Sequence, residues 1–171
     1  MRNQKDEIAT IKERTVVLNL SEADCQRIAE KAGSHGLTVG QLLENFIGDL
    51  VNGTYTNGSD ERNRASDWFE RCWFSYQPEE TLLRHLIEWG CMEEFLDNYR
   101  YLQEALEDLN AAEGEEDREA IQEEVDYQQQ ELKEQYEEYC GYCIGKPEPF
   151  EQAVSGVLKW NEELMKMKGE A

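Results

Sequence analysis

The residues best suited to chemistry are the cysteines and histidines, and Cys140-Gly-Tyr-Cys143 is the one Cys-x-x-Cys pair in the sequence. Such a pair can supply two ligands of a zinc site or the two thiols of a redox centre. A zinc site needs two more ligands, and the candidates, Cys91 and His85, follow no regular zinc spacing. A redox centre of the thioredoxin type needs a βαβ context, which the pattern does not offer. We therefore expect the five cysteines to be thiols, several of them buried, and we expect no metal and no cofactor.

Catalytic constellations are also missing from the sequence. Neither His35 nor His85 has a Glu three residues before it, so the Glu-x-x-His motif of di-iron bundles is absent. The sequence contains no H-E-x-x-H motif, no phosphate-binding glycine loop and no G-x-S-x-G motif. We therefore expect no catalytic residue and a protein that is not an enzyme.

The charge is strongly negative and unevenly spread. The 171 residues include 38 Asp and Glu against 17 Lys and Arg, a formal net charge of −21. Residues 1–53 carry a net −2, residues 54–171 a net −19, and residues 104–139 alone a net −13. This balance opposes general affinity for nucleic acid, which needs Lys and Arg to displace counterions, and it opposes adsorption to anionic membranes.

The acidic stretch is the main candidate for a partner-binding surface. Like charges four residues apart destabilise a helix by a few tenths of a kcal/mol per pair, so many uncompensated acids are unfavourable locally. A partner lined with Lys and Arg would offset that repulsion, and such partners usually bind nucleic acid. The alternative is a solvated face that maintains solubility. The candidate contact residues are Glu115, Glu116, Glu119, Glu123, Glu124 and Asp126.

A second, weaker candidate surface is aromatic. Trp68, Trp73 and Tyr76 lie close together in the sequence, in a segment with more aromatic side chains than one helical stripe can bury. Packing in the core is the alternative, because the four Trp residues lie on or beside apolar stripes.

The sequence pattern predicts a mainly helical chain with one strand near the N-terminus. Residues 15–20, Thr-Val-Val-Leu-Asn-Leu, are rich in β-branched side chains and predict a strand. Ser21, Thr38 and Ser59 are expected N-caps of the next helices. Pro78 is expected to open a short helix that ends near Gly90.

Two long apolar stripes predict an antiparallel coiled-coil hairpin over about residues 91–140, followed by a C-terminal helix. Each arm would be roughly 30–38 Å long at 1.5 Å per residue. Together with the charge distribution, this divides the chain into a nearly neutral module over residues 1–53 and an acidic helical domain over residues 54–171.

One strand followed by a capped helix, a Gly-containing turn and a second helix resembles the ribbon-helix-helix family. The resemblance covers about 40 residues, from Thr15 through the second helix, which Leu37–Leu43 open. It implies a homodimer in which two strands pair as a ribbon that enters the DNA major groove. The residues that would face DNA are Arg14, Thr15, Val17, Asn19 and Thr38, although Val17 has no group that reads a base. A ribbon that only dimerises is the alternative.

Taken whole, the chain resembles, in size, charge and layout, small acidic accessory proteins of phages and mobile elements such as the anti-CRISPR proteins. That resemblance implies a non-catalytic inhibitor of a nucleic-acid-handling enzyme, for example an RNA-guided Cas nuclease. The alternative function is a ribbon-helix-helix transcription regulator with an acidic extension. The start of the sequence has no apolar signal region, so we expect a cytoplasmic protein and no membrane partner.

Overall fold

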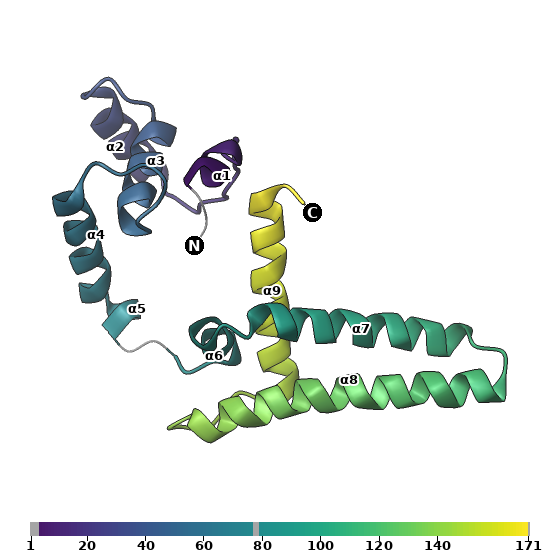
Figure 1. Ribbon diagram of the computed structural model, residues 1–171. Helices are drawn as coiled ribbons and strands as arrows, with labels where there is room; N and C mark the ends of the chain where they lie inside the picture. The colour runs from purple at the N-terminus through teal and green to yellow at the C-terminus, as the bar shows by residue number, and fades with distance from the viewer. Residues whose placement is uncertain (1–3, 77–78, 171) are drawn as a thin grey trace. The chain divides into compact units, whose positions relative to one another are not determined.

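The computed structural model describes residues 4–76 and 79–170, which are mainly helical (Figure 1). The described residues form two compact units: residues 4–76 with 166–170, here called unit 1, and residues 79–165, here called unit 2. The prediction of a mainly helical chain is confirmed. Gly53, the expected domain boundary, lies within unit 1, and an independent module over residues 1–53 stays a prediction.

Unit 1 contains short helices with local sequence signals at their ends. Ser21 and Thr38 are N-caps as predicted, since each hydroxyl accepts a hydrogen bond from an N–H in the first turn. The predicted cap at Ser59 is wrong: Gly58 occupies that position, and the Ser59 hydroxyl contacts the Asp60 carboxylate at 3.4 Å instead. The helices of unit 1 are α1 (Gln4–Ala9), α2 (Glu22–Gly33), α3 (Val39–Leu50), α4 (Ser59–Arg71) and α5 (Trp73–Tyr76).

Unit 1 has a very small core. Among its described residues only Ala32, Asp49 and Ala65 are buried. The Asp49 carboxylate accepts hydrogen bonds from the backbone N–H of Asn57 at 2.7 Å and from its side-chain amide at 2.8 Å, which tie the connector between α3 and α4 to α3. Apolar burial is the main stabilising term in folding, so unit 1 by itself gains little of it.

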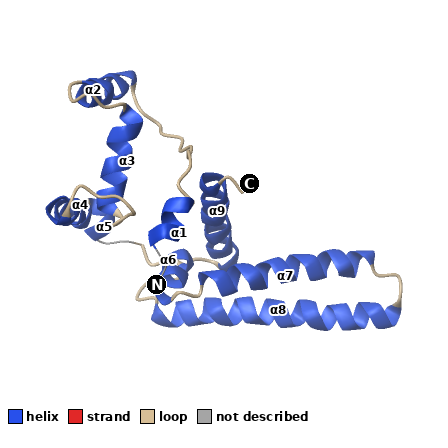
Figure 2. Ribbon diagram, turned by 45° about the horizontal axis from the view of Figure 1, so that its top comes forward, coloured by secondary structure: helices blue, strands red, loops and turns tan. Residues whose placement is uncertain are grey.

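The strand expected over residues 15–20 is not present in the structure. Residues 11–20 have no regular secondary structure (Figure 2). They are all exposed, and Val17 is 86% exposed. A strand is defined by hydrogen bonds to a neighbouring strand, and the described part of the chain contains no second strand to supply them. Without a partner strand, this segment leaves the apolar side chains of Val16, Val17 and Leu18 exposed to solvent.

Unit 2 is built on a helical hairpin, as the two apolar stripes predicted. The long helices α7 (Met92–Ala111) and α8 (Glu115–Tyr142) run antiparallel, side by side (Figure 1). The short helix α6 (Leu82–Trp89) precedes them, and it ends at Gly90, whose φ of 73° places it in the left-handed conformation typical of a helix end. Thr81 caps α6, and Pro78 lies outside the described residues. The last helix, α9 (Phe150–Lys168), packs against this group with its first turns.

The core of unit 2 lies along the inner faces of these helices. On α8 the buried positions are spaced three, four and seven residues apart, the spacing of a coiled-coil seam. The tightly buried residues of the core are Leu82, Leu86, Phe95, Leu132, Val125 and Val157. Because Val125, Leu132 and Tyr139 of α8 point to this core, most of the charged side chains of α8 project to the opposite face.

Candidate acidic interaction surface

The outer face of α8 carries a line of carboxylates that is interrupted between Asp126 and Glu134. Residues three and four apart lie on the same face of a helix, so Glu119, Glu123 and Asp126 point the same way, away from the buried stripe around Val125. At 1.5 Å per residue the line extends about 30 Å. We call this line the acidic row, and its members, all exposed, are Glu116, Glu119, Glu123, Asp126, Glu134 and Glu137.

The structure brings together most of the acidic residues expected from the sequence. All six predicted contact residues lie on α8 and are exposed, and four of them belong to the acidic row. Glu115 is the first residue of the helix, and Glu124 lies to one side, where it accepts a hydrogen bond of 2.7 Å from Gln128. Glu134 and Glu137 were not among the predicted contact residues, although the helical period places them on the same face.

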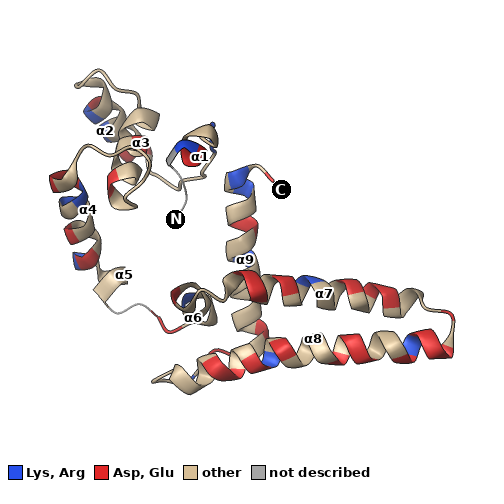
Figure 3. Ribbon diagram, in the orientation of Figure 1, with Lys and Arg blue, Asp and Glu red and all other residues tan. Residues whose placement is uncertain are grey.

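Few basic groups compensate the acidic row. Within the described residues one ion pair reaches it, between Lys133 Nζ and Glu137 at 3.9 Å. The other base of α8, Arg118, donates from Nε to the carbonyl oxygen of Ala112 at 2.9 Å. The local field is therefore strongly negative, and nearby carboxylates, Glu131 first, raise the pKa of the exposed Tyr127. Figure 3 shows acidic residues along both arms of the hairpin.

The predicted aromatic surface lies in unit 1 and is exposed. The exposed fractions are 44% for Trp68, 85% for Trp73 and 80% for Tyr76. Phe74 has edge-to-face contacts with Trp68 and Trp73, at ring centroid distances of 6.4 and 5.9 Å. Such contacts hold the rings together without covering them.

The residues expected to face DNA are also exposed, but two of them have hydrogen bonds within the chain. The Arg14 guanidinium donates to the carbonyl oxygen of Lys168 at 2.7 Å, so it binds the end of α9. The N–H of Thr38, another residue expected to face DNA, donates to the Gln41 side-chain oxygen at 2.9 Å, in a capping box. Thr15, Val17 and Asn19 lie in the exposed segment without regular secondary structure.

Cys143 takes part in hydrogen bonds that join the segment just before α6 to the end of α8. The backbone N–H of Ile144 donates to the Glu80 carboxylate at 2.7 Å, and this bond, with one from the Cys143 thiol, lowers the pKa of Glu80. Tyr139 donates to the backbone carbonyl of Glu80 at 2.9 Å. Among the described residues no three His, Cys, Asp or Glu side chains are grouped as metal ligands. The expectation of thiols without metal stays a prediction for Cys140 and Cys143.

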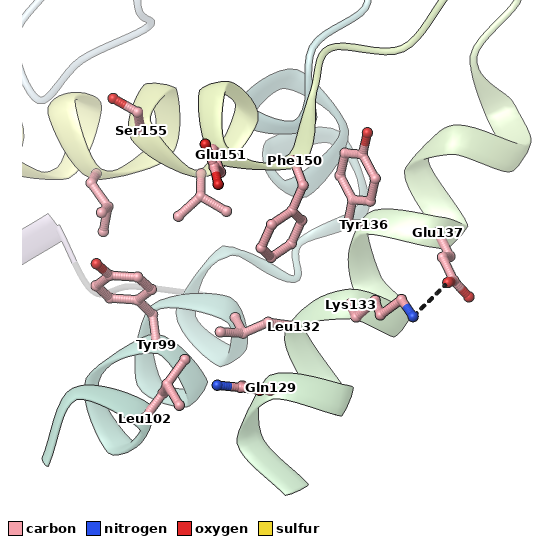
Figure 4. Close-up of a pocket in the computed structure, with 12 residues that line it drawn as sticks. Tyr99, Leu102, Gln129, Leu132, Lys133, Tyr136, Glu137, Phe150, Glu151 and Ser155 are labelled. Atoms are coloured by element: carbon pink, nitrogen blue, oxygen red, sulfur yellow. Dashed lines mark ion pairs between the residues drawn. The ribbon is translucent and has the colours of Figure 1, made fainter. Parts of the chain in front are cut away.

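Unit 2 also contains an apolar groove that the sequence did not indicate. It has a volume of about 750 Å³ and lies between α9 and the hairpin. Leu102, Leu132 and Val154, one from each of α7, α8 and α9, are buried and line it, and Tyr99 and Phe150 also point into it (Figure 4).

Aromatic side chains border the groove where α9 begins. Tyr136 of α8 meets Phe150 of α9 edge to face, with ring centroids 5.2 Å apart. The Tyr136 hydroxyl donates to the backbone carbonyl of Glu148, just before α9. Charged side chains surround the apolar lining: Lys133 and Glu137 from α8 and Glu151 from α9. The groove is therefore apolar at its base and charged at its edge.

Comparisons with known proteins identify no relative. No family model matches the chain, and neither the curated proteins nor the solved structures contain a significant match. No helix in the described part of the chain is both long and apolar enough to cross a bilayer.

Proposed function

We propose that this chain is a non-catalytic interaction protein that binds a basic, nucleic-acid-handling protein through the acidic row of α8. The observation that carries the proposal is that the carboxylates of the acidic row are exposed and that few basic groups compensate their charge. α8 has 11 acidic and two basic residues among its 28. A surface kept only for solubility does not need its charge concentrated on one helix face.

The charge density of α8 is close to that of a nucleic-acid strand. A helix of 28 residues is about 42 Å long, so its 11 carboxylates average one per roughly 4 Å of axis. A single strand of DNA carries one phosphate per about 3.4 Å. A protein channel lined with Lys and Arg for phosphates would therefore also attract α8. The carboxylates would compete with nucleic acid for that channel.

This mode of action fits an inhibitor of the anti-CRISPR kind, directed at an RNA-guided Cas nuclease or its guide complex. Size, charge and layout support this target class, and the acidic row supplies the mechanism. The inhibitor needs no catalytic residue, since occupying the channel is enough to exclude the substrate.

The proposed assembly is a homodimer formed by unit 1. The segment over residues 11–20 exposes Val16, Val17 and Leu18, and no backbone hydrogen bond within the described chain pairs residues 12–20. Pairing with the same segment of a second copy would form an antiparallel ribbon and cover these side chains. The small core of unit 1 favours this, because a second copy adds the apolar burial that one copy lacks.

A second candidate function is a ribbon-helix-helix DNA-binding regulator. The order of an exposed segment followed by α2 and α3, each with a side-chain N-cap, favours it. The hydrogen bonds of Arg14 and Thr38 within the chain favour the inhibitor instead, because both groups would have to exchange partners to bind phosphate.

A pull-down from bacterial lysate, with and without nuclease treatment, distinguishes the two functions. We expect the tagged chain to recover a basic nucleic-acid enzyme that persists after nuclease treatment and whose DNA cleavage the chain inhibits. A Glu119→Lys, Glu123→Lys, Asp126→Lys variant should recover less of it. Recovery of operator DNA alone would refute the inhibitor and support the regulator.

A further inference from the structure

We propose that the groove between α9 and the hairpin binds the apolar face of a basic amphipathic helix of the partner protein. This inference rests on the proposed function. It adds an apolar contact in the groove to the charged contact made by the acidic row. The groove and the acidic row meet at one residue: Glu137 is a member of the row and also lines the groove.

The size and lining of the groove suit a short stretch of helix. Its volume of about 750 Å³ lies in the range of about 300–1,000 Å³ typical of binding pockets. Its lining residues span positions 129–137 of α8 and 150–158 of α9, about two helical turns or roughly 12 Å along each. A bound helix presents apolar anchors at positions i, i+3 or i+4, and i+7 over a similar length.

The charges at the edge favour a basic occupant. Glu137 of α8 and Glu151 of α9 both line the groove, with Lys133 as the basic residue of the lining. Lys133 lies 3.9 Å from Glu137, so it only partly offsets this charge. Lys or Arg residues flanking the apolar face of a bound helix would approach these two carboxylates. A second copy of this chain, with its net charge of −21, would bring like charge to the same edge.

The test uses the full chain and a fluorescent helical peptide of Leu and Lys, with Leu at i, i+3 or i+4, and i+7. The control peptide has the same charge but Ala in place of each Leu. We expect the Ala peptide to bind at least about tenfold more weakly, because each buried Leu adds substantial apolar transfer energy. Ser155→Trp, which fills the groove, should lower the affinity for the Leu peptide by a similar factor. Gln152→Trp, on α9 but outside the groove lining, should leave its affinity within about twofold.

Other outcomes overturn the proposal. It fails if the Leu peptide does not bind, or if the Ala peptide binds as tightly as the Leu peptide. The peptide comparison on the wild-type chain needs no variant, so a Ser155→Trp chain that fails to fold does not leave the proposal untested. Equal binding of both peptides that is lost in the Glu119→Lys, Glu123→Lys, Asp126→Lys variant would refute the groove and leave the acidic row standing. A change of oligomeric state in Ser155→Trp would assign the groove to a second copy instead.

Discussion

Reversing three charges of the acidic row should move stability and binding in opposite directions. The variant Glu119→Lys, Glu123→Lys, Asp126→Lys leaves the core untouched, since all three side chains are exposed. Lys forms helices as well as Glu and better than Asp, so α8 should persist. Position 119 lies beyond the first turn of α8, where the helix dipole disfavours a cation most.

The size of the stability change follows from the neighbours of each residue. Lys at position 119 turns two repulsions, with Glu115 and Glu116, into attractions, a change of about 0.4–1 kcal/mol for each pair. The pairs 119–123 and 123–126 keep like charges. Loss of the 2.8 Å hydrogen bond from Gln122 to Asp126 removes about 0.2–0.5 kcal/mol of this gain in stability. We expect a net gain of about 1 kcal/mol, or about 4–8 °C in the melting temperature of a unit this size.

The assay measures thermal melting of the chain and its association rate with the captured partner at several NaCl concentrations. At low salt the variant should associate at least about tenfold more slowly than the wild type. The matched control is Glu104→Lys, Glu107→Lys, Asp108→Lys, which makes the same charge change on exposed positions of α7. The reasoning is refuted if the α8 variant binds as well as the wild type, or if the α7 control loses as much.

Three further predictions concern the dimer, the core and a tyrosine. Val17→Pro removes a backbone donor from the proposed ribbon, so light scattering should show a dimer for the wild type and a monomer for the variant; a monomeric wild type at micromolar concentration would contradict the ribbon. Phe95→Ala should lower the free energy of unfolding by about 3–5 kcal/mol in urea titrations, because Phe95 is fully buried; a loss below about 1 kcal/mol would place it outside the core. A hydrogen bond with Cys140, together with burial, raises the pKa of Tyr136 to about 12. Its neutral form therefore stabilises the fold below pH 10, an effect lost as the pH rises toward 12. Ultraviolet titration should show late tyrosine ionisation, part of which is missing in Tyr136→Phe.

Local signals explain why most of the helices could be predicted. Each of these signals involves residues that are close in the sequence. They are the capping hydroxyls of Ser21 and Thr38, the glycine at position 90 and the apolar stripes of the hairpin. The acidic face of α8 was predictable for the same reason, because once a helix buries one stripe its period places the remaining carboxylates outside.

Other features depend on contacts that no short stretch of sequence contains. The strand over residues 15–20 needs a partner strand, which the described chain does not supply. The groove needs Tyr99, Leu132 and Phe150 from three different helices to point into one space, and only the crossing of α9 over the hairpin brings them there. The hydrogen bond from Arg14 to Lys168 joins residues 154 positions apart.

Competition between this chain and nucleic acid for the captured partner tests the central claim most directly. The partner is saturated with its guide or substrate nucleic acid, and the affinity of the chain is then measured by titration. If the acidic row occupies the nucleic-acid channel, the apparent dissociation constant should rise in proportion to the concentration of competing nucleic acid, and more salt should weaken the contact further. A ternary complex in which the chain binds with unchanged affinity would contradict the claim.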